Sequence, residues 1–229
     1  MPPIKDAAEM MAADVREGPG PLLLLVGGGL TGWTSWVSRQ ERLAGTRWVA
    51  RVQPLNVQHG LEGRAVPAGY SLRSESEALA RTAADLSPRA PVDLVGWSYG
   101  ASAALVFALD HPERIRTLTL IEPSAFWILD AGGPLDEVSR REIEETRALF
   151  AATAEDVTEE HLASLIRSMG LCPPEITPQE LPRWLPRAQV LELPGGHAPQ
   201  IVAEDAFLEH LARFQANGAP TTVPSARRP

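Results

Sequence analysis

The chain has 229 residues, of which 44% are hydrophobic and 22% are charged, and its formal net charge at pH 7 is −8. These values are ordinary for a soluble globular protein and allow one substantial core, so we expect a single domain over residues 1–216. The acidic charge argues against a nucleic-acid partner or an anionic membrane surface, because either would require a basic protein surface.

The N-terminal residues, MPPIKDAAEM, mix charged groups into the segment and lack the apolar core of a signal peptide. The longest apolar runs, at residues 22–26 and 103–109, are too short to span a bilayer. Cys172 is the single cysteine, which excludes an internal disulfide. We therefore expect a cytoplasmic protein.

Short runs rich in Val, Ile and Leu predict buried strands at residues 22–26, 47–53, 92–95, 115–121 and 188–193. Helical patterns at residues 70–86 and 99–109 lie between some of these strands. Strands and helices that alternate in this way predict an α/β fold, in which a mostly parallel sheet is covered by helices on both faces.

The first predicted strand leads into a glycine loop, VGGGLTGW, in which Gly27, Gly29 and Gly32 fit the dinucleotide-binding pattern G-x-G-x-x-G. That interpretation requires an acidic residue at the end of the next strand, and RWVARVQPLNVQ contains none. The loop also resembles a phosphate-binding loop, but Trp33 stands where that loop requires lysine. The glycines can nevertheless bring backbone N–H groups close to a different anion.

The most informative motif is GWSYG at residues 96–100, which fits G-x-S-x-G between a predicted strand and a helix of small residues. Glycines two residues before and after Ser98 allow the tight turn that exposes such a serine. The helix that follows places partial positive charge beside the serine oxygen. We interpret Ser98 as a catalytic nucleophile.

Residues 130–185 contain two polar, amphipathic helical patterns with no predicted strand between them. A cap-like helical insertion over the strand ends would have this pattern, and so would a plain helical connection. The last residues, 217–229, are small and polar with three prolines, which predicts a disordered tail.

A serine nucleophile needs a base, and His197 is the best candidate because LPGGHAP forms a loop directly after the last predicted strand. Such a loop can carry an imidazole to the strand ends. The other histidines lie in an expected loop, in a helix–strand turn and on two expected amphipathic helices: His59, His111, His161 and His210. No histidine pair has metal-ligand spacing, so we expect no metal and no cofactor.

Together these motifs resemble the α/β-hydrolase fold superfamily, over about residues 21–129 and again over 189–214. The resemblance rests on the glycine loop, the serine turn, HPERIRTLTLIEP at 111–123 and LPGGHAP at 193–199. It implies a catalytic triad in the chain order Ser, acid, His, and an oxyanion hole made of two backbone N–H groups. Tyr99 would supply one of these groups, and Gly29 or Leu30 would supply the other.

The triad acid of this superfamily usually follows the strand before the histidine strand. Here the corresponding stretch, GLCPPEITPQELPRWLPR, contains five prolines and no aspartate, so we expect that strand to be absent and the sheet to be reduced. The best substitute is Glu122 at the end of the strand after the serine helix, a position that certain haloalkane dehalogenases use. Glu122 could instead be a polar strand end. Asp130 is a weaker candidate, and we expect Asp93 to be structural.

Loss of that strand would move His197 sideways by one strand spacing, about 4.8 Å, whereas catalytic contact requires roughly 2.6–3.2 Å. The two strands that usually open the fold also have at most twenty residues in which to form. The chain thus resembles a shortened member of the superfamily.

Two functions follow from this resemblance. The favoured one is a serine hydrolase that cleaves an ester, a lactone or a similar small acyl compound through an acyl-enzyme. Aromatic side chains would line its substrate pocket beside Leu30, or would belong to the core: Trp33, Trp97, Phe126 and Trp127. The alternative is a non-catalytic or impaired relative that binds a small apolar ligand or a protein partner.

Overall fold

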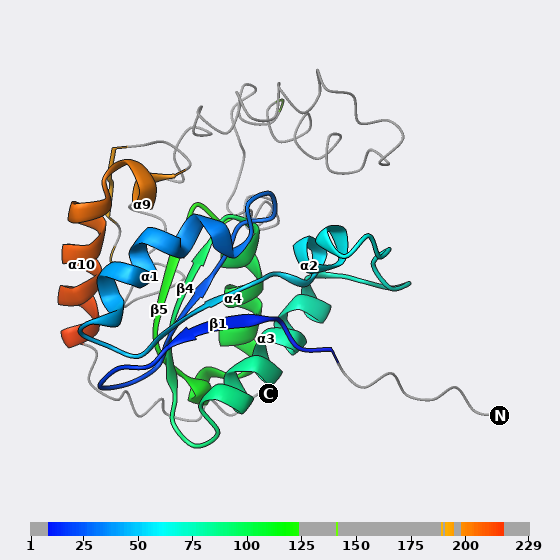
Figure 1. The fold of residues 1–229 in the computed structure, drawn as a ribbon, viewed down its shortest axis with the longest axis horizontal. Helices are drawn as coiled ribbons and strands as arrows, with labels where there is room; N and C mark the ends of the chain where they lie inside the picture. Colours follow the sequence, from blue (N-terminus) through cyan, green and yellow to red (C-terminus); the bar gives the residue numbers. More distant parts are fainter. Residues whose placement is uncertain (1–8, 124–140, 142–188, 190, 195–197, 218–229) are drawn as a thin grey trace. The chain divides into compact units, whose positions relative to one another are not determined.

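The computed structural model describes residues 9–123, 141, 189, 191–194 and 198–217 (Figure 1). The chain forms two compact units, one made of Met1–Ser124 with Glu204–Pro229 and the other made of Ala125–Ala203. The first unit contains the sheet. In the second unit, the described residues include the short helix α9 (Pro199–Val202). The helical segment expected at 130–185, apart from Arg141, and the tail expected after residue 217 lie outside the described residues, so the predicted domain limits stay predictions.

The first unit is built on one sheet with the strand order β1-β3-β2-β4-β5. The strands are β1 (Ala13–Arg16), β2 (Leu23–Val26), β3 (Val49–Val52), β4 (Val92–Trp97) and β5 (Ile115–Ile121). All neighbouring pairs are parallel except β1 and β3, which are antiparallel. Every residue of β2 and β4 is buried; β2 is entirely apolar, and β4 carries one charged residue, Asp93. The predicted α/β class with a mostly parallel sheet is confirmed.

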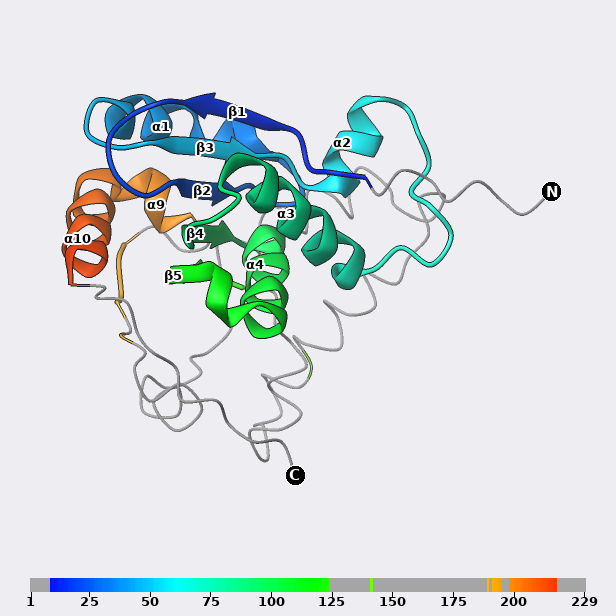
Figure 2. The same cartoon turned by 90° about the horizontal axis from the view of Figure 1, so that it is seen from below.

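Helices cover both faces of this sheet, as Figure 2 shows: α1 (Val37–Ala44) and α10 (Glu204–Ala216) lie on one face, and α3 (Leu72–Leu86) and α4 (Tyr99–Asp110) on the other. The first pair is joined by a 2.8 Å ion pair between Arg39 and Glu204. The start of α3 is defined by Ser71, which forms a capping box with Ser74. Both predicted helices are confirmed, with their ends shifted by one or two residues.

The structure corrects two expectations about single elements and adds one strand that the sequence did not predict. The stretch predicted as a strand at 188–193 is not a strand at any of its described residues, 189 and 191–193. Leu191 is 47% exposed, so the burial on which the strand prediction rested is not realised. His59, expected in a loop, lies on helix α2 (Leu55–Leu61) and is buried. Strand β1 was not predicted, because its sequence ADVR is short and half polar.

Asp93, at the second position of β4, is fully buried. Its carboxylate accepts hydrogen bonds from Arg47, Arg116 and Thr117, and the two arginines form ion pairs with it. The group stands at the end of β4 opposite to Ser98. This position agrees with the structural role expected for Asp93.

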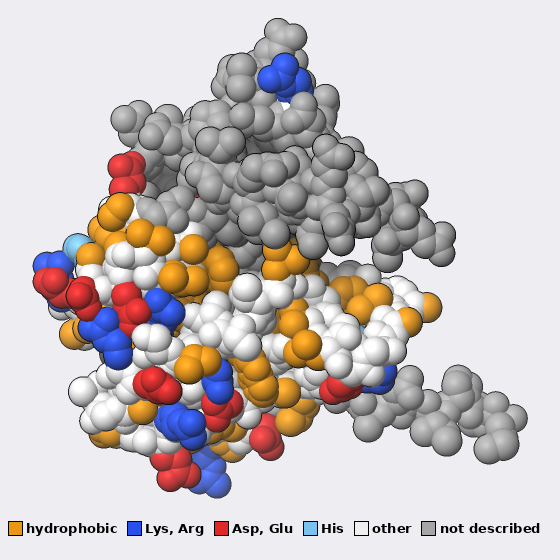
Figure 3. Space-filling view, turned by 45° about the horizontal axis from the view of Figure 1, so that its top comes forward, with side chains coloured by type: hydrophobic (Ala, Val, Ile, Leu, Met, Phe, Trp, Pro, Cys, Tyr) orange, Lys and Arg blue, Asp and Glu red, His pale blue; other side chains and the backbone are white. Residues whose placement is uncertain are grey.

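Figure 3 shows Lys/Arg and Asp/Glu side chains interspersed on one face of the described residues. Within the described part of the chain, no helix combines the length and the apolar character needed to cross a membrane. Nor do the described residues contain a group of three or more His, Cys, Asp or Glu side chains that could hold a metal ion.

Candidate active site

Ser98 occupies a sharp turn between β4 and α4, so the predicted strand–turn–helix context is confirmed. Its backbone has φ 54° and ψ −120°, a combination that residues other than glycine rarely adopt. Backbone strain of this kind costs on the order of 1–3 kcal/mol and is found mostly at functional sites. The turn therefore presents Ser98 in a conformation that the fold must hold in place.

The two glycines of GWSYG are required by close backbone contacts. A Cβ atom at Gly96 would lie 2.6 Å from the Cα of Ala101, inside the first turn of α4. A Cβ atom at Gly100 would lie 2.2 Å from the carbonyl oxygen of Gly27. Neither position has room for a side chain, because the obstacle in both is backbone. Helix α4 can therefore start directly against the end of β2.

The glycine loop after β2 is closed on itself by a 2.9 Å hydrogen bond from the Gly32 N–H to the carbonyl oxygen of Gly28. Gly32 has φ 51°, and a Cβ atom there would lie 2.3 Å from Oε1 of Gln53. The same oxygen accepts a 2.7 Å hydrogen bond from the N–H of Trp33. Gln53 is buried and directly follows β3, so a side chain that the sequence analysis did not single out fixes the shape of the loop.

Two residues expected to form the oxyanion hole lie side by side. A Cβ atom at Gly29 would stand 3.3 Å from the Cβ of Tyr99, which is closer than ordinary van der Waals contact. Leu30, the alternative residue in the loop, has a side chain that is 56% exposed. The glycine loop and the residue after Ser98 are thus in contact.

Glu122 lies next to Ser98 at the end of the neighbouring strand. Trp97 and Ile121 are paired in the parallel register of β4 and β5, and Ser98 and Glu122 are the residues that follow them. The Ser98 N–H donates a 2.8 Å hydrogen bond to the carbonyl oxygen of Ile121. Glu122 also has a positive φ, 45°, and is half-buried.

The expected base and part of the expected pocket cannot be placed beside these groups. His197, Phe126, Trp127 and Asp130 lie outside the described residues.

The two described aromatic candidates are both held by their surroundings. Trp97 is 8% exposed, and its ring lies against Gly28, where a Cβ atom would be 3.1 Å from Cε3. Trp33 is half-buried, with the guanidinium of Arg51 5.4 Å from the centre of its ring. Trp97 therefore supports the glycine loop by packing, and Trp33 makes a cation–π contact.

A polar cluster that the sequence analysis did not identify reaches the residue after the nucleophile. The hydroxyl of Tyr99 is 2.7 Å from the hydroxyl of Tyr70, which donates a hydrogen bond to the buried carboxylate of Glu75. Burial, together with the charge of Glu75, raises the pKa of both tyrosines well above the usual value. The sequence does contain a signal for this cluster: Glu75 occupies one of the apolar positions of the predicted helix, where a charged residue requires polar partners.

Comparisons with known proteins agree with this geometry. Residues 21–170 match the family model of the alpha/beta hydrolase fold. A 2-hydroxymuconate semialdehyde hydrolase from Pseudomonas sp. (strain CF600) is 34% identical over 121 residues, which are 49% of this chain and 42% of that protein. The match thus spans less than half of the length of this curated relative.

Solved structures show the same fold. An enol-lactonase from Burkholderia xenovorans LB400 superposes with a TM-score of 0.58 at 17% identity, covering 90% of this chain and 96% of that chain. An epoxide hydrolase from Bacillus megaterium superposes with a TM-score of 0.54 at 14% identity and the same coverage, 90% and 96%.

Proposed function

Because the chain belongs to the alpha/beta hydrolase fold family, we propose that it is a serine hydrolase that cleaves a small ester, lactone or similar acyl compound. The observation that carries the proposal is the strained conformation of Ser98 at the turn between β4 and α4, directly beside the glycine loop. The names of the semialdehyde hydrolase and the enol-lactonase support a small carbonyl compound as substrate.

In the proposed reaction, the Oγ of Ser98 attacks the substrate carbonyl while His197 accepts the serine proton. The C–O bond to the leaving group breaks, and His197 returns the proton to the leaving oxygen. Water then attacks the acyl-enzyme by the same route and frees Ser98. Glu122 orients the imidazole and stabilises its protonated form. No metal or cofactor is needed for these steps.

The negative charge on the carbonyl oxygen would be stabilised by the N–H group of Tyr99 and by that of Gly29 or Leu30. The contact between Gly29 and Tyr99 supports this assignment, because both groups of an oxyanion hole must approach one oxygen. We further propose that the acyl part of the substrate binds beside Trp33, Trp97, Phe126 and Trp127. A serine at the turn, rather than an aspartate, disfavours epoxide-hydrolase or dehalogenase chemistry.

Labelling with a fluorophosphonate probe tests the proposal, since the probe reacts covalently with activated serines. Wild-type protein is expected to be labelled and Ser98→Ala is not. Ser102→Ala is the matched control: Ser102 lies one turn later on α4, is fully buried and forms no side-chain hydrogen bond with any described residue, so this variant should be labelled like wild type. A folded wild-type protein that is never labelled would contradict the proposed function.

The second candidate is a non-catalytic member of the family that binds a small apolar ligand or a protein partner. One observation favours it: residues 189 and 191–193, which precede His197 in the sequence, do not form the expected strand. In that case the folded protein would not react with the fluorophosphonate, while an apolar fluorescent dye would still bind and Trp97→Ala would weaken its binding.

A further inference from the structure

Glu75 is a charged residue in an unusual place. It lies on the inner side of α3, is 0% exposed, and shares that side with the core residues Ala78 and Leu79. A buried carboxylate costs several kcal/mol unless hydrogen bonds replace its water. None of the described Lys and Arg residues forms an ion pair with it. Its stability in the core must therefore come from neutral donors.

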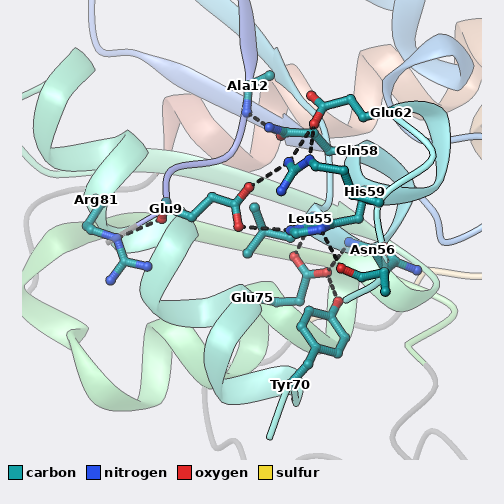
Figure 4. A network of polar contacts seen from close by, with 12 residues as sticks. Glu9, Ala12, Leu55, Asn56, Gln58, His59, Glu62, Tyr70, Glu75 and Arg81 are labelled. Carbon is teal, nitrogen blue, oxygen red and sulfur yellow. Dashed lines mark hydrogen bonds and ion pairs between the residues drawn. The ribbon is translucent and has the colours of Figure 1, made fainter. Parts of the chain in front are cut away.

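Those donors come from two other parts of the chain, as Figure 4 shows. Oε2 accepts a 2.8 Å hydrogen bond from the N–H of Leu55, and Oε1 accepts a 3.0 Å hydrogen bond from the N–H of Asn56. Oε1 also accepts the hydroxyl proton of Tyr70. One carboxylate thus fixes the first turn of α2 and the ring of Tyr70 together.

The chain of hydrogen bonds continues to Tyr99 with a defined direction. The hydroxyl of Tyr70 has one proton, and that proton is donated to Glu75. The 2.7 Å contact between the two tyrosine hydroxyls is consequently donated by Tyr99. The Tyr99 side chain is held at its hydroxyl by Tyr70, and the glycine loop passes close to its other end, where a Cβ built on Gly29 would stand 3.3 Å from the Tyr99 Cβ.

The same carboxylate also reaches the other side of the proposed oxyanion hole. Asn56, whose N–H binds Glu75, places its Nδ2 atom 3.6 Å from the position of a Cβ at Gly29. Of the two proposed sources of N–H groups, Tyr99 is therefore connected to the buried carboxylate by hydrogen bonds, and Gly29 lies close to Asn56, which the same carboxylate binds. Sub-ångström alignment of such groups decides how well they stabilise an oxyanion.

We propose that Glu75 is a positioning residue of the oxyanion hole, which acts through Tyr70 on Tyr99 and through Asn56 on the glycine loop. This inference rests on the proposed hydrolase function. On this inference, Tyr70 and Tyr99 affect the rate of acyl transfer and not substrate binding. Both hydroxyl protons are already donated, that of Tyr70 to Glu75 and that of Tyr99 to Tyr70, so neither is available to a substrate.

Tyr70→Phe and Tyr99→Phe test the inference, since each removes the connecting hydrogen bond with little change of shape. With p-nitrophenyl butyrate as substrate, we expect kcat to fall between about 10-fold and 100-fold in each variant, with KM within about twofold of wild type. The double variant should be no slower than the slower single variant, because both changes break the same connection. Glu77→Gln, at an exposed position of α3, is the matched control and should leave kcat unchanged.

Thermal unfolding of each variant separates positioning from general stability. An unchanged kcat in both Phe variants would overturn the inference, whether or not their Tm is lower. The proposed function would still stand in that case if the wild-type protein is labelled by the fluorophosphonate. A folded wild-type protein that is not labelled would contradict the proposed function itself. Should Tyr70→Phe not fold, Tyr99→Phe breaks the same hydrogen bond from the other side and decides the question alone.

Discussion

The Ser98 N–H donates its hydrogen bond to the carbonyl oxygen of Ile121, the residue directly before Glu122. Ser98 and Glu122 thus follow a pair of hydrogen-bonded strand ends, and both have positive φ, 54° and 45°. Strain at both residues can persist only because the parallel pairing of β4 and β5 over-determines their conformation. The proposed nucleophile and the proposed acid are consequently placed by one piece of sheet, not by two independent loops.

If Glu122 is the triad acid, Glu122→Gln should lower kcat by about 10³–10⁴-fold, because a neutral amide cannot stabilise the protonated imidazole. KM should change little. Glu122→Asp should retain part of the rate. Steady-state kinetics with p-nitrophenyl butyrate measures the effect, and Glu113→Gln, an exposed position at the other end of β5, is the control. A wild-type rate in Glu122→Gln would remove Glu122 from the mechanism and favour Asp130.

Gly100→Ala should destabilise the fold by about 1–3 kcal/mol or more, because the new Cβ would meet the carbonyl oxygen of Gly27 at 2.2 Å. Urea unfolding measures the free energy. The control is Gly60→Ala on α2, where a Cβ meets nothing within 4 Å and helix propensity favours alanine by up to about 1 kcal/mol. Equal effects of the two substitutions would show that the contact between α4 and the end of β2 can widen to admit a methyl group.

Asp93→Asn should lower the free energy of unfolding by about 3–5 kcal/mol, since it leaves Arg47 and Arg116 without the buried anion that they share. Asp110→Asn is the matched control: its 3.0 Å ion pair with Arg73 is partly exposed and should contribute less than about 1 kcal/mol. Urea unfolding of both variants gives the comparison. A loss below 1 kcal/mol for Asp93→Asn would mean that the neutral amide satisfies both arginines.

The interactions of Glu9 should make the free energy of unfolding fall in acid. Burial acts to raise the pKa of its carboxyl, but hydrogen bonds from Arg64 and His59, at 2.9 and 2.8 Å, outweigh burial and lower the pKa below its usual value of 4.5. A pKa that is lower in the folded state gives stability that is full above about pH 4.5 and is lost as the pH falls through the folded value. Glu62 also binds Arg64, so it shares the cation.

Urea unfolding between pH 7 and pH 3 measures this dependence. Glu9→Gln should be less stable than wild type at pH 7 and should lose less stability on acidification. Glu17→Gln, at an exposed position just after β1, should follow the wild-type curve. Parallel curves for wild type and Glu9→Gln would contradict the assignment.

The parts of the molecule that local sequence determines were predictable. Strands β2, β4 and β5 are rich in apolar residues, and Gly96 reflects a contact with Ala101 only a few residues away in the chain. The parts that were missed depend on distant partners. Strand β1 exists because Asp14 and its neighbours pair with β3, and Glu75 is buried because Leu55, Asn56 and Tyr70 supply its hydrogen bonds.

The error at residues 188–193 has a different origin. A short stretch such as AQVLEL, with Val and Leu among polar residues, forms a buried strand only if a neighbouring strand is available to pair with it. The local pattern of apolar and polar residues cannot reveal whether such a neighbouring strand exists. The described residues of this stretch are largely exposed.

Strand β1 also matters for the association of one molecule with another. It shields the outer edge of β3, whose sequence VARV is apolar except for Arg51. It also carries two charged residues, Arg16 and Asp14, of which Asp14 is paired with Arg51 at 2.6 Å. Charged side chains on an edge strand discourage strands of other molecules from joining the sheet. A chain shortened to begin after Arg16 would expose the β3 edge instead, and would aggregate by sheet extension even though Ser98 and its surroundings were untouched.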